Sequence, residues 1–259
     1  MCSSDLEGVD PALVGRRVIA VPDFGPGGFT EITVARASQV FPLPDTMPDV
    51  EAAALHVTYQ TGHLALHRRA AIRPGETLLV HAGAGGVGSA AIQLGLAAGA
   101  RVLATAGGPE KVAMLRDLGV EVAIDYRAED FVEVVKAATG GAGADVIFDP
   151  VGGDTFDRSR KCIAFEGRLL VIGFTSGRIP EAPANHALVK NYSVVGVHWG
   201  LYNTKQPERI REIHGDLVDL HARGAIRPLV HEVITLDEVP AALTRLASRG
   251  TTGKVVWAR

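Results

Sequence analysis

Short apolar segments alternate with helical segments along the middle of the chain, and this alternation constrains the fold more than any other feature. The segments with strand character are 76–82, 101–106, 121–126, 144–151, 168–174 and 192–199. The segments with helical character between them are 87–98, 109–119, 129–139 and 154–164. Strands that alternate with helices form a parallel sheet covered by helices on both faces. The sequence therefore predicts an α/β fold.

Shorter elements are predicted on both sides of this region, from β-branched runs, turn residues and helix-start signals. The expected strands are 16–21, 29–35 and 254–258, and the segment IRPLVHEVITL (226–236) is not assigned. The expected helices begin near Val50 and cover 61–71, 206–223 and 237–249.

Composition narrows the classes of function. The 259 residues include 26 basic and 29 acidic side chains, a net charge of −3, which gives no basic field for nucleic acid or an anionic membrane. No apolar run is long enough to span a bilayer, and the first residues lack the pattern of a signal peptide. Cys2 and Cys162 are too few for a disulfide framework. We expect a cytoplasmic protein without nucleic-acid or membrane partners.

The strongest motif is a glycine-rich loop, HAGAGGVGS, over residues 81–89. Gly83, Gly85 and Gly88 match the pattern G-x-G-x-x-G, and the loop follows a predicted strand and opens a predicted helix. Glycines allow a tight turn and a close approach of the backbone to a pyrophosphate, and the helix N-terminus offers unbonded N–H groups. In this context the motif predicts dinucleotide binding.

The end of the second predicted strand indicates which dinucleotide is bound. An NAD site usually has Asp or Glu there, because a carboxylate binds the ribose 2′-hydroxyl. This strand ends LATAGG (103–108) without an acid, and Lys111, Tyr126 and Arg127 are nearby donors for a 2′-phosphate. The alternative is that Lys111 and Arg127 are ordinary solvated charges. We expect NADPH to be the cofactor.

Several short segments together resemble one family. They are AGAGGVG, GGPEK, IDY, DPVGG, VIGF and LVKNYSVVGVHWG. With them, residues 15–259 resemble the zinc-free quinone oxidoreductase (zeta-crystallin-like) branch of the medium-chain dehydrogenase/reductase superfamily. The resemblance implies an α/β fold with a Rossmann-type doubly wound parallel sheet and a partial GroES-like β-barrel domain.

The resemblance also implies a domain organisation. Residues 1–56 would be the remnant of a GroES-like catalytic domain, 57–224 an NADP-binding Rossmann domain, and 225–259 a return to the catalytic domain. The match begins at GRRV (15–18), late in the barrel, so we expect an N-terminal truncation. Residues 1–6 (MCSSDL) resemble a translated sequencing adaptor and would then be non-native; the alternative is a short disordered N-terminus.

The resemblance assigns cofactor binding to residues in several separate segments. The glycine loop would face the pyrophosphate, Lys111 and Tyr126 the 2′-phosphate, and Thr61 the nicotinamide end. Phe174 would lie on the path between the two ends, although it could equally be plain core. The expected cofactor-binding residues are Thr61, Gly83, Gly85, Gly86, Val87, Gly88, Lys111, Tyr126, Val151, Gly152, Phe174, Thr175 and Lys254. No catalytic residue is assigned.

Metal binding is not expected. Zinc members of the superfamily have a cysteine where this chain has Val57, and a structural zinc lobe would need four cysteines within 22–30, where there are none. His63 and His67 are four residues apart on a predicted helix, which is a weak metal pair without a third ligand.

The sequence and the resemblance lead to a predicted function with alternatives. We expect an NADPH-dependent oxidoreductase that transfers hydride to a quinone or another conjugated carbonyl without zinc. The alternatives are an enoyl-thioester reductase, which a basic patch at Arg158, Arg160 and Lys161 would favour, and a non-catalytic NADPH-binding protein or inactive fragment. The resemblance also implies a homodimer through the strand at 192–199.

Overall fold

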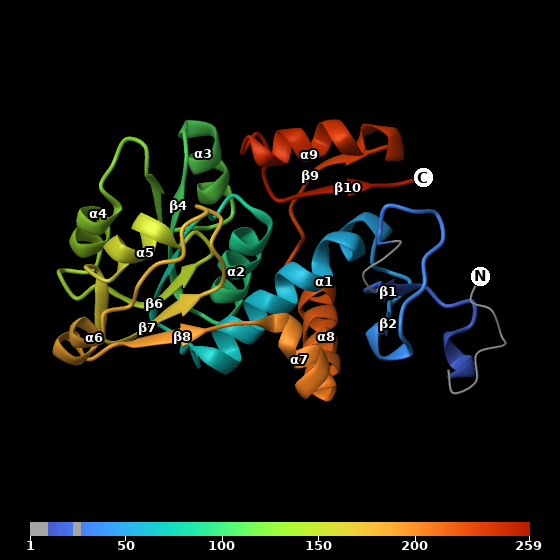
Figure 1. Cartoon of the computed structure of the whole chain (residues 1–259), viewed down its shortest axis with the longest axis horizontal. Coiled ribbons are helices and arrows are strands. Elements are labelled where there is room, and N and C mark those ends of the chain that lie inside the picture. Colours follow the sequence, from blue (N-terminus) through green and yellow to red (C-terminus); the bar gives the residue numbers. More distant parts are fainter. Residues whose placement is uncertain (1–9, 23–26) are drawn as a thin grey trace. The chain divides into compact units, whose positions relative to one another are not determined.

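The chain divides by packing into two units in the computed structural model, which describes residues 10–22 and 27–259 (Figure 1). Residues 58–199 form one unit, and residues up to 57 form the other together with 200–259. Within the described residues, no helix has the length and apolar character needed to cross a membrane.

A six-stranded sheet is the centre of the 58–199 unit. Its strands have the order β5-β4-β3-β6-β7-β8, and every neighbouring pair is parallel. This order is the doubly wound arrangement of a dinucleotide-binding fold, so the predicted Rossmann-type α/β class is confirmed. The strands are β3 (Thr77–Val80), β4 (Arg101–Ala106), β5 (Val122–Asp125), β6 (Ala144–Asp149), β7 (Ile163–Val171) and β8 (Ser193–Gly196).

The inner strands are apolar because helices cover both faces of the sheet (Figure 1). Leu79 of β3, Leu103 of β4 and Ile147 of β6 are fully buried in one cluster. The side chains of Phe131 and Val135 pack against this cluster from α4. The helices of the unit are α2 (Gly86–Ala97), α3 (Pro109–Asp117), α4 (Phe131–Ala138), α5 (Gly153–Ser159) and α6 (Ala184–Lys190).

Two predictions in this unit need correction. The helix predicted over 154–164 ends at Ser159, because Ile163 already pairs with Ala144 as the first residue of β7. The strand predicted over 192–199 is shorter, since β8 ends at Gly196 and α7 (Trp199–Lys205) begins at the tryptophan.

The helices predicted from Val50 and over 61–71 form one continuous helical run. The run consists of α1 (Asp49–His63) followed directly by a π-helical segment, η3 (Leu64–Arg69). The division into units falls inside α1, between Val57 and Thr58.

The second unit holds α8 (Pro207–Ala222), which the sequence analysis had placed in the Rossmann domain. His214 of α8 donates a hydrogen bond from Nε2 to the carbonyl oxygen of Pro42 at 2.9 Å. His221 lies 2.6 Å from the Glu51 carboxylate of α1. By packing, the unit that holds the six-stranded sheet ends at Trp199.

The strands that the structure describes in this unit form two separate pairs. An antiparallel pair joins β1 (Val18–Ala20) to β2 (Val40–Pro42), and a parallel pair joins β9 (Val230–Ile234) to β10 (Lys254–Trp257). The remaining elements are η1 (Pro11–Leu13), η2 (Ala37–Gln39), η4 (Leu236–Glu238) and α9 (Val239–Ala247).

The strand predicted at 29–35 is wrong, since residues 27–36 form no strand. Phe29, Ile32 and Val34 are exposed there. Alternating β-branched residues form a strand only when a neighbouring strand completes the hydrogen-bond ladder, and this segment pairs with no described strand.

Candidate dinucleotide site

The glycine loop turns the chain from β3 into α2 through tight backbone hydrogen bonds. The amide of Gly83 donates to the carbonyl of Thr105 in β4 at 2.9 Å, and the amide of Gly85 donates to the carbonyl of Ala82 at 3.0 Å. Gly85 caps α2 without a side-chain hydrogen bond. The first amides of a helix have no partner within the helix, so those that follow Gly85 are available to a ligand.

The glycines of this loop have different structural roles. A Cβ at Gly88 would lie 2.2 Å from the carbonyl oxygen of Ala82, so only glycine lets α2 pack this closely against the loop. A Cβ at Gly83 would lie 2.9 Å from Leu115 Cδ2. A Cβ at Gly85 would meet only the Ala82 oxygen, at 3.4 Å, which the protein itself would tolerate. The bare side of Gly85 thus forms a cradle that a pyrophosphate fits and a side chain would fill.

His81, the residue before this loop, is a buried group that the sequence analysis missed. Its Nδ1 lies 3.1 Å from Thr105 Oγ1, and its Nε2 lies 2.8 Å from Ser159 Oγ. Ser159 uses its hydroxyl proton to bond the carbonyl of Thr155, so His81 Nε2 must donate to Ser159 and Nδ1 must accept from Thr105. Burial, with a smaller effect of Arg158, lowers the pKa of His81 to about 3. The imidazole is therefore neutral and joins β3, β4 and α5.

The ends of β4 and β5 bring together the groups predicted to bind a 2′-phosphate. A Cβ at Gly107 would lie 2.6 Å from Tyr126 Oη and 2.9 Å from Arg127 Nε, so both polar groups lie against the backbone at the end of β4. Lys111 is in the first turn of α3, directly after this turn. Tyr126 as a whole residue is 41% exposed.

Asp125 shapes this turn, and the sequence analysis gave it no role. Its Oδ1 accepts hydrogen bonds from the amides of Gly108 and Arg127, both at 3.0 Å. These two bonds lower the pKa of Asp125, so the carboxylate is ionised at neutral pH. An anion bound beside it needs the cationic groups of Arg127 and Lys111 to offset this charge.

The loops after β6 and β7 hold the expected residues Val151, Gly152, Phe174 and Thr175. Asp149, at the end of β6, accepts hydrogen bonds from the amides of Val151 at 2.8 Å and Gly152 at 3.0 Å. Burial raises the pKa of Asp149, while these hydrogen bonds act against the rise. A Cβ at Gly152 would lie 2.9 Å from Phe174 Cδ1, so the aromatic ring packs on the glycine.

Thr61 is buried on α1, next to the point where α1 approaches α2. Lys254 belongs to the other unit. Gly62, next to Thr61, approaches α2 so closely that a Cβ there would lie 2.9 Å from Leu94 Cδ1. Lys254 begins β10 in the other unit, where it pairs with Val230. All the expected cofactor residues except Lys254 thus belong to the 58–199 unit.

Within residues 10–22 and 27–259, no three His, Cys, Asp or Glu side chains are grouped to hold a metal ion. The rings of His63 and His67 have centroids 4.4 Å apart.

The order of the strands in the sheet and the glycine cradle at Gly85 together define a dinucleotide-binding unit of the type found in nicotinamide-dependent oxidoreductases. Residues 86–215 match the family model described as zinc-binding dehydrogenase. A quinone oxidoreductase-like protein 2 homolog from Nematostella vectensis is 37% identical over 244 residues, 93% of this chain and 66% of that protein. The bovine (Bos taurus) quinone oxidoreductase-like protein 2 is 36% identical over 93% of this chain and 69% of its own length. The chain thus spans about two thirds of these relatives.

Solved structures agree with this grouping. A quinone oxidoreductase from Pseudomonas syringae superposes with a TM-score of 0.84 at 30% identity, over 95% of this chain and 75% of that one. A mycobacterial protein solved with NADPH superposes with a TM-score of 0.84 at 30% identity, over 90% of this chain and 73% of that one. The CurK enoyl reductase superposes with a TM-score of 0.77 at 31% identity, over 88% of this chain and 67% of that one. The chain belongs to the quinone oxidoreductase-like branch of the medium-chain dehydrogenase/reductase superfamily, a family of oxidoreductases, which confirms the predicted family.

The pKa of His81 predicts a pH dependence of stability. An unfolded His81 gains a proton below its ordinary pKa of about 6.5 while the folded one stays neutral, so the folded state loses stability as pH falls. His81→Gln should lower the slope of the unfolding free energy against pH by about 1 kcal/mol per pH unit between pH 6.5 and 5. Urea titrations at several pH values measure the slope.

Thr105→Val is the matched control, because it removes the hydrogen bond to His81 Nδ1 but no titrating group. We expect it to lower stability by roughly 1 kcal/mol at every pH and to keep the wild-type slope. An unchanged slope in His81→Gln would contradict the prediction.

Proposed function

We propose that the chain is an NADPH-dependent oxidoreductase that reduces a quinone or another conjugated carbonyl without zinc. The observation that carries the proposal is the glycine cradle at Gly85 together with the cationic and hydroxyl groups at the ends of β4 and β5. Bound NADPH would supply the hydride. The chain's own part is to hold the pyrophosphate at the N-terminus of α2 and the 2′-phosphate beside Gly107.

Preference for NADPH rests on the charges around the end of β4. No carboxylate ends this strand, and the carboxylate of Asp125, after β5, already accepts two backbone hydrogen bonds. Arg127 lies against Gly107, and Lys111 begins the next helix. These cations strengthen the binding of a dianionic 2′-phosphate through charge-assisted hydrogen bonds, whereas they strengthen the binding of a ribose 2′-hydroxyl little.

NADPH and NADH titrations, followed by cofactor fluorescence, test the proposal. We expect the wild type to bind NADPH at least about tenfold more tightly than NADH. Arg127→Met should weaken NADPH binding about tenfold and leave NADH binding nearly unchanged, because only NADPH carries the 2′-phosphate.

Arg116→Met is the matched control, since Arg116 is an exposed cation on the same helix as Lys111 but in its last turn. It should leave both affinities unchanged. Equal affinities of the wild type for NADPH and NADH would contradict the proposed cofactor preference.

The acceptor has two candidate classes. The quinone oxidoreductase-like relatives favour a quinone, and the solved CurK enoyl reductase favours an enoyl thioester as the second candidate. A thioester's phosphate tail would need the basic patch at 158–161. There, however, Arg158 is paired with Asp130 at 2.6 Å and Arg160 with Asp157 at 3.3 Å. The patch thus gives the thioester less support than its sequence suggests.

NADPH oxidation with a benzoquinone, an alkenal and an enoyl-CoA ranks the acceptors. We expect the quinone to be turned over fastest, with the same rate before and after dialysis against a chelator. Turnover of the enoyl-CoA alone would favour the thioester reductase. NADPH binding without turnover of any acceptor would favour a non-catalytic binding protein or inactive fragment.

We also propose a homodimer formed through β8. This strand ends the sheet order, so no described strand pairs with its outer edge, and the carbonyl oxygen of Gly196 there accepts a hydrogen bond from Arg69 Nε at 3.1 Å. Val194 on β8 is 38% exposed, and Leu188 and Val189 on α6, just before it, are 77% and 79% exposed. An apolar edge of this kind is suited to a second copy of the chain.

Size-exclusion chromatography with light scattering tests the dimer. We expect a dimer at micromolar concentration and a monomer for Val194→Lys, which places a charge on the edge. Leu243→Lys, on the exposed face of α9, is the control and should stay dimeric. A wild type that elutes as a clean monomer would refute the proposed dimer.

A further inference from the structure

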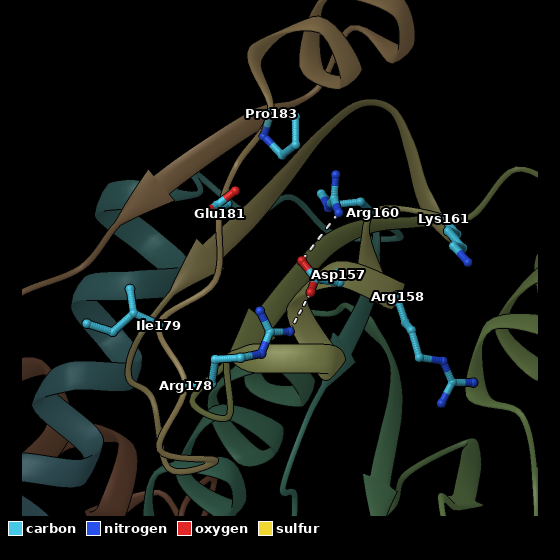
Figure 2. Close-up of a pocket in the computed structure, with 8 residues that line it drawn as sticks. All are labelled: Asp157, Arg158, Arg160, Lys161, Arg178, Ile179, Glu181 and Pro183. Carbon is cyan, nitrogen blue, oxygen red and sulfur yellow. Dashed lines mark hydrogen bonds and ion pairs between the residues drawn. The ribbon is translucent and has the colours of Figure 1, made fainter.

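A hollow of about 620 Å³ lies between α5 and the segment that connects β7 to α6 (Figure 2). Its lining includes four cations, contributed by Arg158, Arg160, Lys161 and Arg178. Figure 2 shows Arg160 and Arg178 both reaching Asp157, while Arg158 points away from it. Such a hollow would ordinarily indicate an anion site.

The cations of the hollow are, however, largely engaged with acids of the protein. Arg178 contacts Asp157 at 2.5 Å and Asp154 at 2.8 Å. Arg158 and Arg160 each have an acidic partner as described above, which leaves Lys161 as the lining cation without an ion pair among the described residues. These charges therefore join segments of the protein to one another.

Arg178 belongs to the loop that carries Phe174 and Thr175. The backbone of this loop is already joined to the loop after β6: the amide of Thr175 donates to the carbonyl of Pro150 at 3.1 Å, and the amide of Ser176 donates to that of Val151 at 3.0 Å. The amide of Gly153 donates in return to the carbonyl of Arg178 at 3.1 Å. The two loops thus form one layer of backbone at the carboxyl ends of β6 and β7.

The side chain of Arg178 adds a second attachment, to α5. Asp154 and Asp157 are three residues apart and so lie on one face of this helix, where a single guanidinium reaches both carboxylates. Arg160 contacts the other oxygen of Asp157 from the end of the helix and holds that carboxylate in place. Because α5 begins at Gly153, the attachment fixes the far end of the loop to the helix that follows the loop after β6.

We propose that Arg178 is a positioning residue, which clamps the Phe174–Thr175 loop against α5 and so positions the stretch of the cofactor that this loop would contact on the way to the nicotinamide. The inference rests on the proposed function, because it takes that loop to contact the cofactor. The clamp acts on that stretch only, since the glycine cradle and the groups at Gly107 belong to other loops.

The geometry separates this role from a general contribution to stability. The Arg178 side chain is 49% exposed, and that of Asp154 is 94% exposed. Exposed ion pairs contribute little to the stability of a whole fold. An Arg178 variant should therefore fold normally and differ in the order of one loop.

Hydrogen–deuterium exchange of the unliganded chain tests the clamp directly. In Arg178→Met we expect the amides of Thr175, Ser176 and Gly153, which are bonded between the two loops, to exchange about tenfold faster than in the wild type. The amides of β3 and β4 should exchange at the wild-type rate. Arg178→Lys should recover part of the protection, because a lysine keeps the charge but lacks the planar fork that reaches two carboxylates.

Arg158→Met is the matched control. Arg158 lines the same hollow and is similarly exposed, but its ion pair with Asp130 leads to the N-cap of α4 instead of the loop. It should leave the exchange of the loop amides unchanged. Wild-type exchange in Arg178→Met, or equal acceleration in Arg158→Met, would overturn the proposal.

Titration with NADPH gives a second readout. In Arg178→Met we expect an affinity within about threefold of the wild type, since both phosphate contacts persist, with a smaller increase of nicotinamide fluorescence at saturation. If the wild type binds no NADPH while the variant still exchanges faster, the proposed function fails and the clamp as a loop attachment stands. If the wild type binds NADPH and the variant matches it in exchange and fluorescence, the clamp fails and the proposed function stands.

Discussion

The close approach of α2 to the end of β3 is the constraint on which the site depends. It exists because Gly88 has no side chain that would meet the carbonyl oxygen of Ala82. Since β3 lies between β4 and β6, the position of this helix start also fixes where the loops after its neighbours must lie. A positive helix end is thereby held at the middle of the sheet, where the carboxyl ends of the strands converge.

Polar groups at the strand ends support this arrangement by bonding the protein itself. Asp125 after β5 and Asp149 after β6 each accept two backbone amides of the following turn. His81 links β3 to Thr105 and Ser159 from inside the fold. The hydrogen bonds of these residues fix the shape of the loops. The surface of the site is therefore formed by backbone and a few exposed side chains.

The sheet and the glycine loop could be predicted from the sequence, because apolar periodicity and glycine spacing are local signals. It failed at residues 29–35, where strand-forming residues have no described partner strand, since pairing is not encoded locally. It also missed His81, Asp125 and Arg178. Their roles depend on contacts with residues distant in the chain, such as Ser159 for His81, and no spacing rule reports those. The one hint for His81 was a histidine ending an apolar strand.

In this fold, the residues that would hold a dinucleotide and the residues that would distinguish one dinucleotide from another lie in different loops. The loop between β3 and α2 would hold what every dinucleotide shares, whereas the side chains after β4 and β5 would distinguish one from another. Exchange of a few residues at the sheet's outer strand can therefore alter coenzyme choice while the central turn stays intact. Such separation makes coenzyme choice an evolvable trait, because a lineage could change its electron source without rebuilding the core of the molecule.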